Sequence, residues 1–143
     1  MKSLAKFLRL DFLPRSPDGA LLMLRIWIGL SMLSLHGWGK LTGFSEKSGK
    51  FMSVFGLGPK ASMALAVFGE FFCSILLVLG LFTRFAALSG AITMTVAFTL
   101  AHKGALKGPG NGELAFIYLA AYLTLFLAGG GRFSCDAKMG GRK

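Results

Sequence analysis

The chain has few acidic residues and few cysteines, and it lacks the short motifs that mark common soluble enzymes. It contains 6 Asp and Glu residues against 16 Lys and Arg. Its two cysteines, Cys73 and Cys135, do not form a C-x-x-C motif, so the chain has no chemistry for thiol–disulfide exchange on its own. A P-loop, a nucleophile elbow and a dinucleotide-binding glycine motif are also absent. No class of soluble enzyme therefore gains support from the sequence.

Long apolar stretches are what the chain has instead. Hydrophobic residues make up 54% of it, and the mean hydropathy is +0.64. A helix rises ~1.5 Å per residue and the hydrocarbon layer is ~30 Å thick, so roughly 20 apolar residues cross a membrane. The stretches near this length predict an all-α, antiparallel bundle of four transmembrane helices, over about residues 19–40, 61–82, 85–102 and 113–130.

The predicted transmembrane domain covers residues 19–131, between a basic N-terminal tail at 1–18 and a basic C-terminal tail at 132–143. The loop at 41–60 has a charged half followed by an apolar half, which predicts a short interfacial helix over the outer mouth of the bundle. The N-terminal tail is amphipathic near Phe7, so it either lies on the membrane surface or is disordered.

The net charge of +10 is spread over the flanks of the apolar stretches rather than along one face. This distribution argues against nucleic acid as a partner and favours lipid headgroups. More basic residues lie in the segments on the side of the two tails than on the other side. We therefore expect a multi-pass protein of the plasma membrane with both termini in the cytoplasm.

A single carboxylate, Glu70, lies in the middle of the second apolar stretch, near the predicted midplane of the membrane. An ionisable group at that depth costs a few kcal/mol or more, and it usually faces a bundle interior, a partner charge or a ligand. Arg25 could pair with Glu70, either as a structural strut or within a functional site. Alternatively, Arg25 reaches the inner headgroups, and Glu70 stays protonated and hydrogen-bonds to Ser74 or to a carbonyl of the first helix.

Other polar residues recur at helical spacing within the predicted helices. His36 either hydrogen-bonds to a neighbouring helix or acts as a proton donor or ligand near the outer mouth. Tyr118 and Tyr122, one turn apart on the last helix, are interfacial anchors or ligand-binding groups. One stripe of the first helix contains Arg25, Gly29, Met32, His36 and Lys40.

Metal or haem binding has little support. His36 and His102 could in principle bind iron between the first and third helices, but no carboxylate or thiolate accompanies them in the sequence pattern. We therefore expect no metal, no haem and no covalently bound cofactor.

Short motifs also follow one another in a set order along the chain. The first helix starts from Arg25 and ends in H-G-x-x-K at residues 36–40, and the stretch from Glu70 ends in G-L-F-T-R at 80–84. The last helix lies between Asn111-Gly112-Glu113, which is similar to an N-G-x-E motif, and a G-R-x-S-x-D motif at 131–136. This order resembles the DoxX family of small bacterial and archaeal membrane proteins. The resemblance implies a four-helix integral membrane protein, and some relatives are associated with thiosulfate:quinone oxidoreduction or with complexes that handle sulfur and oxidative stress.

Our leading hypothesis is the membrane subunit of an oxidoreductase, with a quinone or similar carrier between the first, second and fourth helices. Glu70 would relay a proton, Arg25 would set its charge state, His36 would connect it to the outer surface, and Tyr118 would donate to a carbonyl oxygen. Tyr122, Lys40 and His102 are further candidate ligand-binding residues.

No motif for a flavin, haem or iron–sulfur cluster is present, so a soluble redox or sulfur-handling partner would have to supply electrons. The alternatives are a non-enzymatic membrane anchor for soluble partners, or a small-solute transporter, which would more naturally be a homo-oligomer.

Overall fold

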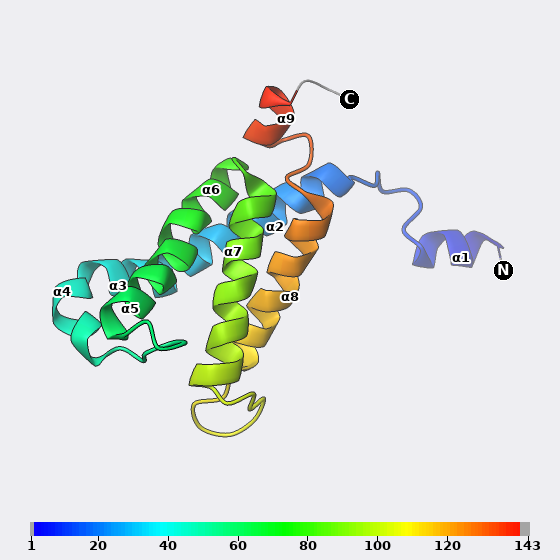
Figure 1. The fold of residues 1–143 in the computed structure, drawn as a ribbon. Helices are drawn as coiled ribbons and strands as arrows, with labels where there is room; N and C mark the ends of the chain where they lie inside the picture. The colour runs from blue at the N-terminus through cyan, green and yellow to red at the C-terminus, as the bar shows by residue number, and fades with distance from the viewer. Residues whose placement is uncertain (1, 141–143) are drawn as a thin grey trace.

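The computed structural model describes residues 2–140 and is built of helices, with no strand in that part of the chain (Figure 1). This confirms the all-α prediction. The first long helix runs through α2 (Pro17–Met32), a π-helical turn η1 (Leu33–Gly37) and α3 (Trp38–Thr42). The second runs through α5 (Pro59–Val67), the π-helical turn η3 (Phe68–Phe72) and α6 (Cys73–Leu79). The third joins α7 (Thr83–Val96) to the π-helical turn η4 (Ala97–Ala101), and the fourth is α8 (Glu113–Ala128).

Three of these helices within the described residues are long and apolar enough to cross a membrane, namely those at Pro17–Thr42, Pro59–Leu79 and Thr83–Ala101. The fourth, α8, is apolar but has 16 residues. The bundle therefore has three to four apolar helices of the kind that span membranes, and the predicted count of four spans is not confirmed.

Sequence signals explain where the long helices begin and end. Ser16 caps α2, because its side chain accepts a hydrogen bond from the Gly19 amide at 3.1 Å, and Pro17 occupies the first turn. Pro59 likewise occupies the first turn of α5, which has no side-chain cap. The second helix ends at Gly80, whose positive φ of 69° is the left-handed conformation that closes many helices.

The long helices do not stay parallel along their length. Figure 1 shows α7 and α8 side by side, while the pair formed by α2–α3 and α5–α6 diverges from them in one direction. We call the end where the helices converge, and where both tails leave, the terminal end. The opposite end, which carries the long loops, is the loop end.

The interfacial helix predicted for the loop at 41–60 is not confirmed. Helical turns occupy its charged half, as α4 (Phe44–Lys47) and the 3-10 turn η2 (Ser48–Lys50). The apolar half, residues 51–58, is not helical and extends from this region toward the lower end of α7 in Figure 1. Positive φ angles at Phe55, Gly56 and Gly58 break any helical path there.

The two tails each contain one short helix. The N-terminal α1 (Lys2–Leu8) lies away from the bundle in Figure 1, with Leu4, Phe7 and Leu8 exposed. Its position on a membrane surface stays a prediction. The C-terminal α9 (Cys135–Met139) packs over the terminal end, where the Asp136 amide donates to the Gly80 carbonyl at 2.9 Å.

Candidate ligand-binding site

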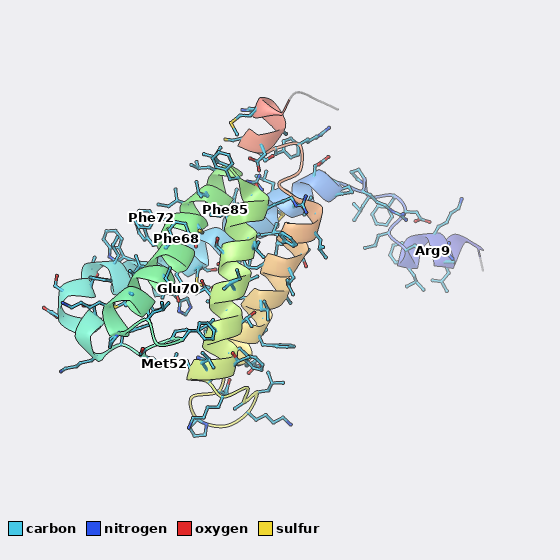
Figure 2. The ribbon with its side chains drawn as sticks, in the orientation of Figure 1. Arg9, Met52, Phe68, Glu70, Phe72 and Phe85 are labelled. Carbon is cyan, nitrogen blue, oxygen red and sulfur yellow. The ribbon has the colours of Figure 1, made fainter. Side chains whose placement is uncertain are left out.

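A cavity of about 310 Å³ lies toward the loop end, where the helices diverge. Its walls come from α3, α5, η3, α7 and η4, and residues 51–58 cover it. No residue of α8 lines it, so this cavity is not between the first, second and fourth helices, where we expected the carrier. Figure 2 shows Glu70 between the second and third long helices and Met52 on the covering segment. Most of the lining is apolar, and the polar side chains are Lys40, Ser62, Glu70, Thr93 and His102.

An ion pair faces this cavity. The Lys40 ammonium donates to the Glu70 carboxylate, with Nζ and Oε2 2.5 Å apart. Glu70 is only 6% exposed, whereas the Lys40 side chain is 28% exposed. The carboxylate is therefore held at the buried side of the cavity, and the lysine connects it to the surface. A charge-assisted hydrogen bond in apolar surroundings is stronger than the same pair in water.

Close helix crossings fix the position of Glu70. A Cβ atom on Gly37 would lie 2.6 Å from the Glu70 carbonyl oxygen, so only glycine lets η1 cross η3 at this distance. On the other side, a Cβ atom on Gly69 would clash with the Thr93 hydroxyl of α7. The Ser74 hydroxyl also donates to the Glu70 carbonyl oxygen at 2.8 Å. The carboxylate therefore projects from a backbone that is constrained on three sides.

Glu70 lies within a π-helical turn, and η1 and η4 are further turns of this kind in residues 2–140. A π-helical turn adds a residue to the helix and shifts the faces that follow it, and such turns are frequent at functional sites. Lys40 follows η1 and His102 ends η4. Among the five polar residues that line the cavity, Glu70 lies within a π-helical turn, His102 directly follows one, and Lys40 lies three residues after one.

Arg25 does not pair with Glu70. Its guanidinium is buried and donates to the carbonyl oxygens of Leu77 (3.0 Å), Val78 (3.3 Å) and Phe133 (3.1 Å). Its Nε atom has no partner among the described residues. The Arg25–Glu70 pair, one of the alternatives that the sequence left open, does not form, because the guanidinium reaches carbonyl oxygens at the C-terminal end of α6 and before α9, where a cation is favourable.

His36 and the tyrosines are not among the residues that line the cavity. The His36 ring meets the Tyr118 ring edge-on, with centroids 5.8 Å apart, and the Tyr118 hydroxyl donates to Ser31 at 2.8 Å. Tyr122 is buried beside Tyr118, and its hydroxyl has no hydrogen-bond partner in the described part of the chain. The structure thus brings Lys40, Glu70 and His102 together and leaves Arg25, His36, Tyr118 and Tyr122 outside the cavity.

Sequence reasoning missed the residues that hold the cover. Ser62 of α5 is buried, and its hydroxyl accepts from the Val54 amide at 2.9 Å and donates to the Gly58 carbonyl at 2.7 Å. A serine near the start of an apolar helix is too common to indicate this contact. His102, at the rim, lies with Nδ1 2.7 Å from the Gly110 carbonyl oxygen.

Comparison with known proteins connects this site to a family. The family model named DoxX matches residues 20–103, a range that includes every residue lining the cavity. The chain belongs to the DoxX family. With its apolar helices, this DoxX-family chain is a membrane protein.

Two uncharacterized proteins of Haemophilus influenzae are similar to this DoxX-family chain over most of its length. One is 36% identical over 114 residues, which are 75% of this chain and 81% of the relative. The other is 31% identical over 122 residues, which are 82% of this chain and 81% of the relative. No solved structure matches the chain.

Proposed function

We propose that this DoxX-family protein is the membrane subunit of an oxidoreductase system, and that its loop-end cavity binds a quinone or a similar lipophilic carrier. The observation that carries the proposal is the Lys40–Glu70 ion pair facing a largely apolar cavity. We further propose that the membrane is the plasma membrane and that both termini are cytoplasmic.

The size and lining of the cavity suit the head of such a carrier. Pockets for small ligands are typically about 300–1,000 Å³, mostly apolar, with a few polar groups that orient the ligand. The cavity volume of about 310 Å³ is at the small end of this range, large enough for one substituted ring. The Lys40 ammonium is a donor for a ring carbonyl oxygen, and the apolar walls contact the faces of the ring.

Reduction of a quinone to a quinol requires two electrons and two protons. Glu70 and Lys40 form a proton-exchanging pair at the cavity, and the partly exposed Lys40 links that pair to the loop end. The electrons would come from a soluble redox or sulfur-handling partner that carries its own cofactor. In this proposal the chain supplies the lipophilic site and the proton path, and the partner supplies the electron path.

The test is retention of a quinone by the purified protein in lipid nanodiscs, measured by native mass spectrometry with decyl-benzoquinone as the probe. We compare the wild type with Glu70→Gln, and we use Glu113→Gln as the matched control because Glu113 is exposed and does not line the cavity. Wild type and Glu113→Gln should retain the probe. Glu70→Gln should bind it with an affinity at least about tenfold lower.

Retention of phospholipid alone by the folded wild type would contradict the proposal. In that case a role as a non-enzymatic anchor for soluble partners would be the better account of the chain. Equal retention by all three proteins would place the probe outside the cavity and would also count against the site.

A further inference from the structure

The rim of the cavity is apolar and exposed on the side between the second and third long helices. Leu65 of α5 and Ile92 of α7 both line the cavity, yet they are 56% and 57% exposed. A side chain that lines a cavity and is more than half exposed lies at its opening. Phe55 and Leu57 of the covering segment also line the cavity and are 79% and 53% exposed, so that segment forms the remaining apolar edge of the opening. By contrast, Glu70 is almost fully buried on the inner side. The cavity therefore runs from an apolar opening to a charged inner end.

This opening is at the depth of lipid chains. Leu65 lies six residues from the start of α5, and Ile92 lies nine residues from the end of η4. At ~1.5 Å per residue, these positions are roughly 9 and 14 Å inside the loop end of their helices. Both helices are long and apolar enough to cross a membrane. Leu65 and Ile92 therefore face hydrocarbon rather than water.

Toward the terminal end the same two helices are closed against each other. Phe68 and Phe85 meet edge-on with ring centroids 6.4 Å apart (Figure 2). Phe68 lies three residues beyond Leu65, and Phe85 lies seven residues before Ile92, so both pairs are on the same faces of their helices. The line where the second and third helices meet is therefore shut at the phenylalanines and open at Leu65 and Ile92.

Access from the loop end is covered. Residues 51–58 lie over the cavity, with the buried Val54 held through its amide by Ser62. A molecule that arrived from water would have to displace this segment, whereas a molecule dissolved in the membrane meets an apolar opening directly. An entrance used by a water-soluble ligand would also present polar groups, which Leu65 and Ile92 do not.

We propose that the cavity opens sideways into the membrane between α5 and α7, and that its ligand has a polar ring and a long hydrocarbon tail. The ring lies at Lys40 and Glu70, and the tail passes out between Leu65 and Ile92 into the lipid. This inference rests on the proposed quinone site and adds to it the route of entry and the requirement for a tail.

The experiment uses two probes and two substitutions at the opening. The probes are decyl-benzoquinone and the same benzoquinone without its decyl chain, added to the full chain in nanodiscs. Ile92→Trp fills the opening, and Leu65→Trp does so from the other helix. Ile117→Trp on α8 is the matched control, because Ile117 is 55% exposed and does not line the cavity. Affinities are compared between variants at equal probe content of the bilayer, so that partitioning of the tail cancels.

We expect Ile92→Trp and Leu65→Trp to weaken binding of the tailed probe about tenfold more than binding of the tailless probe, because the tail occupies the opening and the ring does not. Ile117→Trp should change neither affinity. If the tailed and tailless probes are affected equally, or if neither is affected in folded protein, the sideways opening is wrong although the quinone site stands. If the wild type binds neither probe, the proposed function itself fails, which distinguishes the two failures.

Discussion

The two ends of the bundle use charged residues in opposite ways. At the terminal end, Arg25 donates to backbone carbonyl oxygens, and the Asp136 carboxylate accepts from the backbone amides of Phe82 and Thr83 at 2.7 and 2.8 Å. At the loop end, Lys40 and Glu70 bond to each other and face a cavity. Charges at the terminal end therefore complete the helix ends, whereas those at the loop end are available to a ligand.

Short motifs of similar appearance therefore differ in role according to the end of the bundle at which they lie. The G-L-F-T-R motif at 80–84 and the G-R-x-S-x-D motif at 131–136 meet at the terminal end, where Asp136 joins them by hydrogen bonds to Phe82 and Thr83. These residues connect the end of the second helix, the start of the third and the C-terminal segment. The H-G-x-x-K motif at 36–40 instead supplies the Gly37 crossing and the Lys40 ammonium at the cavity. The first two motifs stabilise the fold, and the third shapes the site.

The largest effect on stability should come from Arg25→Met. The change removes charge-assisted hydrogen bonds to Leu77, Val78 and Phe133 inside the terminal end, and we expect the free energy of unfolding to fall by about 3 kcal/mol or more. Glu70→Gln at the loop end should cost about 1 kcal/mol, because the partly exposed Lys40 can then turn to water. Unfolding of both variants in mixed micelles measures the difference. Equal costs would show that the two ends do not differ as described.

A smaller effect is expected where η1 crosses η3. Gly37→Ala would place a Cβ atom 2.6 Å from the Glu70 carbonyl oxygen, so the helices must move apart. We expect a loss of about 2 kcal/mol in unfolding free energy and weaker quinone binding, since Lys40 and Glu70 lie on the two displaced helices.

Gly39→Ala provides the control for this crossing. No atom within 4 Å would meet a Cβ there in the described residues, so alanine should be neutral or should stabilise the helix by up to about 1 kcal/mol. If the two alanine variants behaved alike, the close approach at Gly37 would not be what positions Glu70.

Much of the fold follows from the sequence because apolar length alone predicts long helices. The helices expected at 19–40 and 61–82 are observed at Pro17–Thr42 and Pro59–Leu79. The non-helical cover at 51–58 was missed because its apolar residues look like those of an interfacial helix, while its path depends on positive φ angles and on the contact with Ser62.

Of the site, the sequence indicates Glu70 and Lys40 but not their pairing. Counting residues along straight, parallel helices puts Lys40 near the surface and Glu70 about 15 Å deeper. Because η1 crosses η3 at Gly37, Glu70 lies within one helical turn of Lys40, and the long lysine side chain reaches the carboxylate. Glu70 was one of the partners considered for Arg25 because a charged side chain is visible in a sequence, whereas the carbonyl oxygens that Arg25 binds carry no sequence signal.

The smallest and most closely matched test compares two serines. Ser62 and Ser134 are both buried, and each hydroxyl accepts one backbone amide and donates to one backbone carbonyl, Ser62 at the loop end and Ser134 at the terminal end. Each alanine substitution should lower the free energy of unfolding of the segment that its serine holds by about 1 kcal/mol.

The two substitutions should differ in their effect on the whole bundle. Since Ser62 holds only the cover, Ser62→Ala should speed amide hydrogen exchange at Val54 and leave the melting temperature nearly unchanged. Ser134→Ala should lower the melting temperature, because Ser134 adjoins the Phe133 carbonyl that binds Arg25. A fall in melting temperature for Ser62→Ala as large as for Ser134→Ala would mean that the cover is part of the cooperative core, and that a ligand could not displace it independently of the bundle.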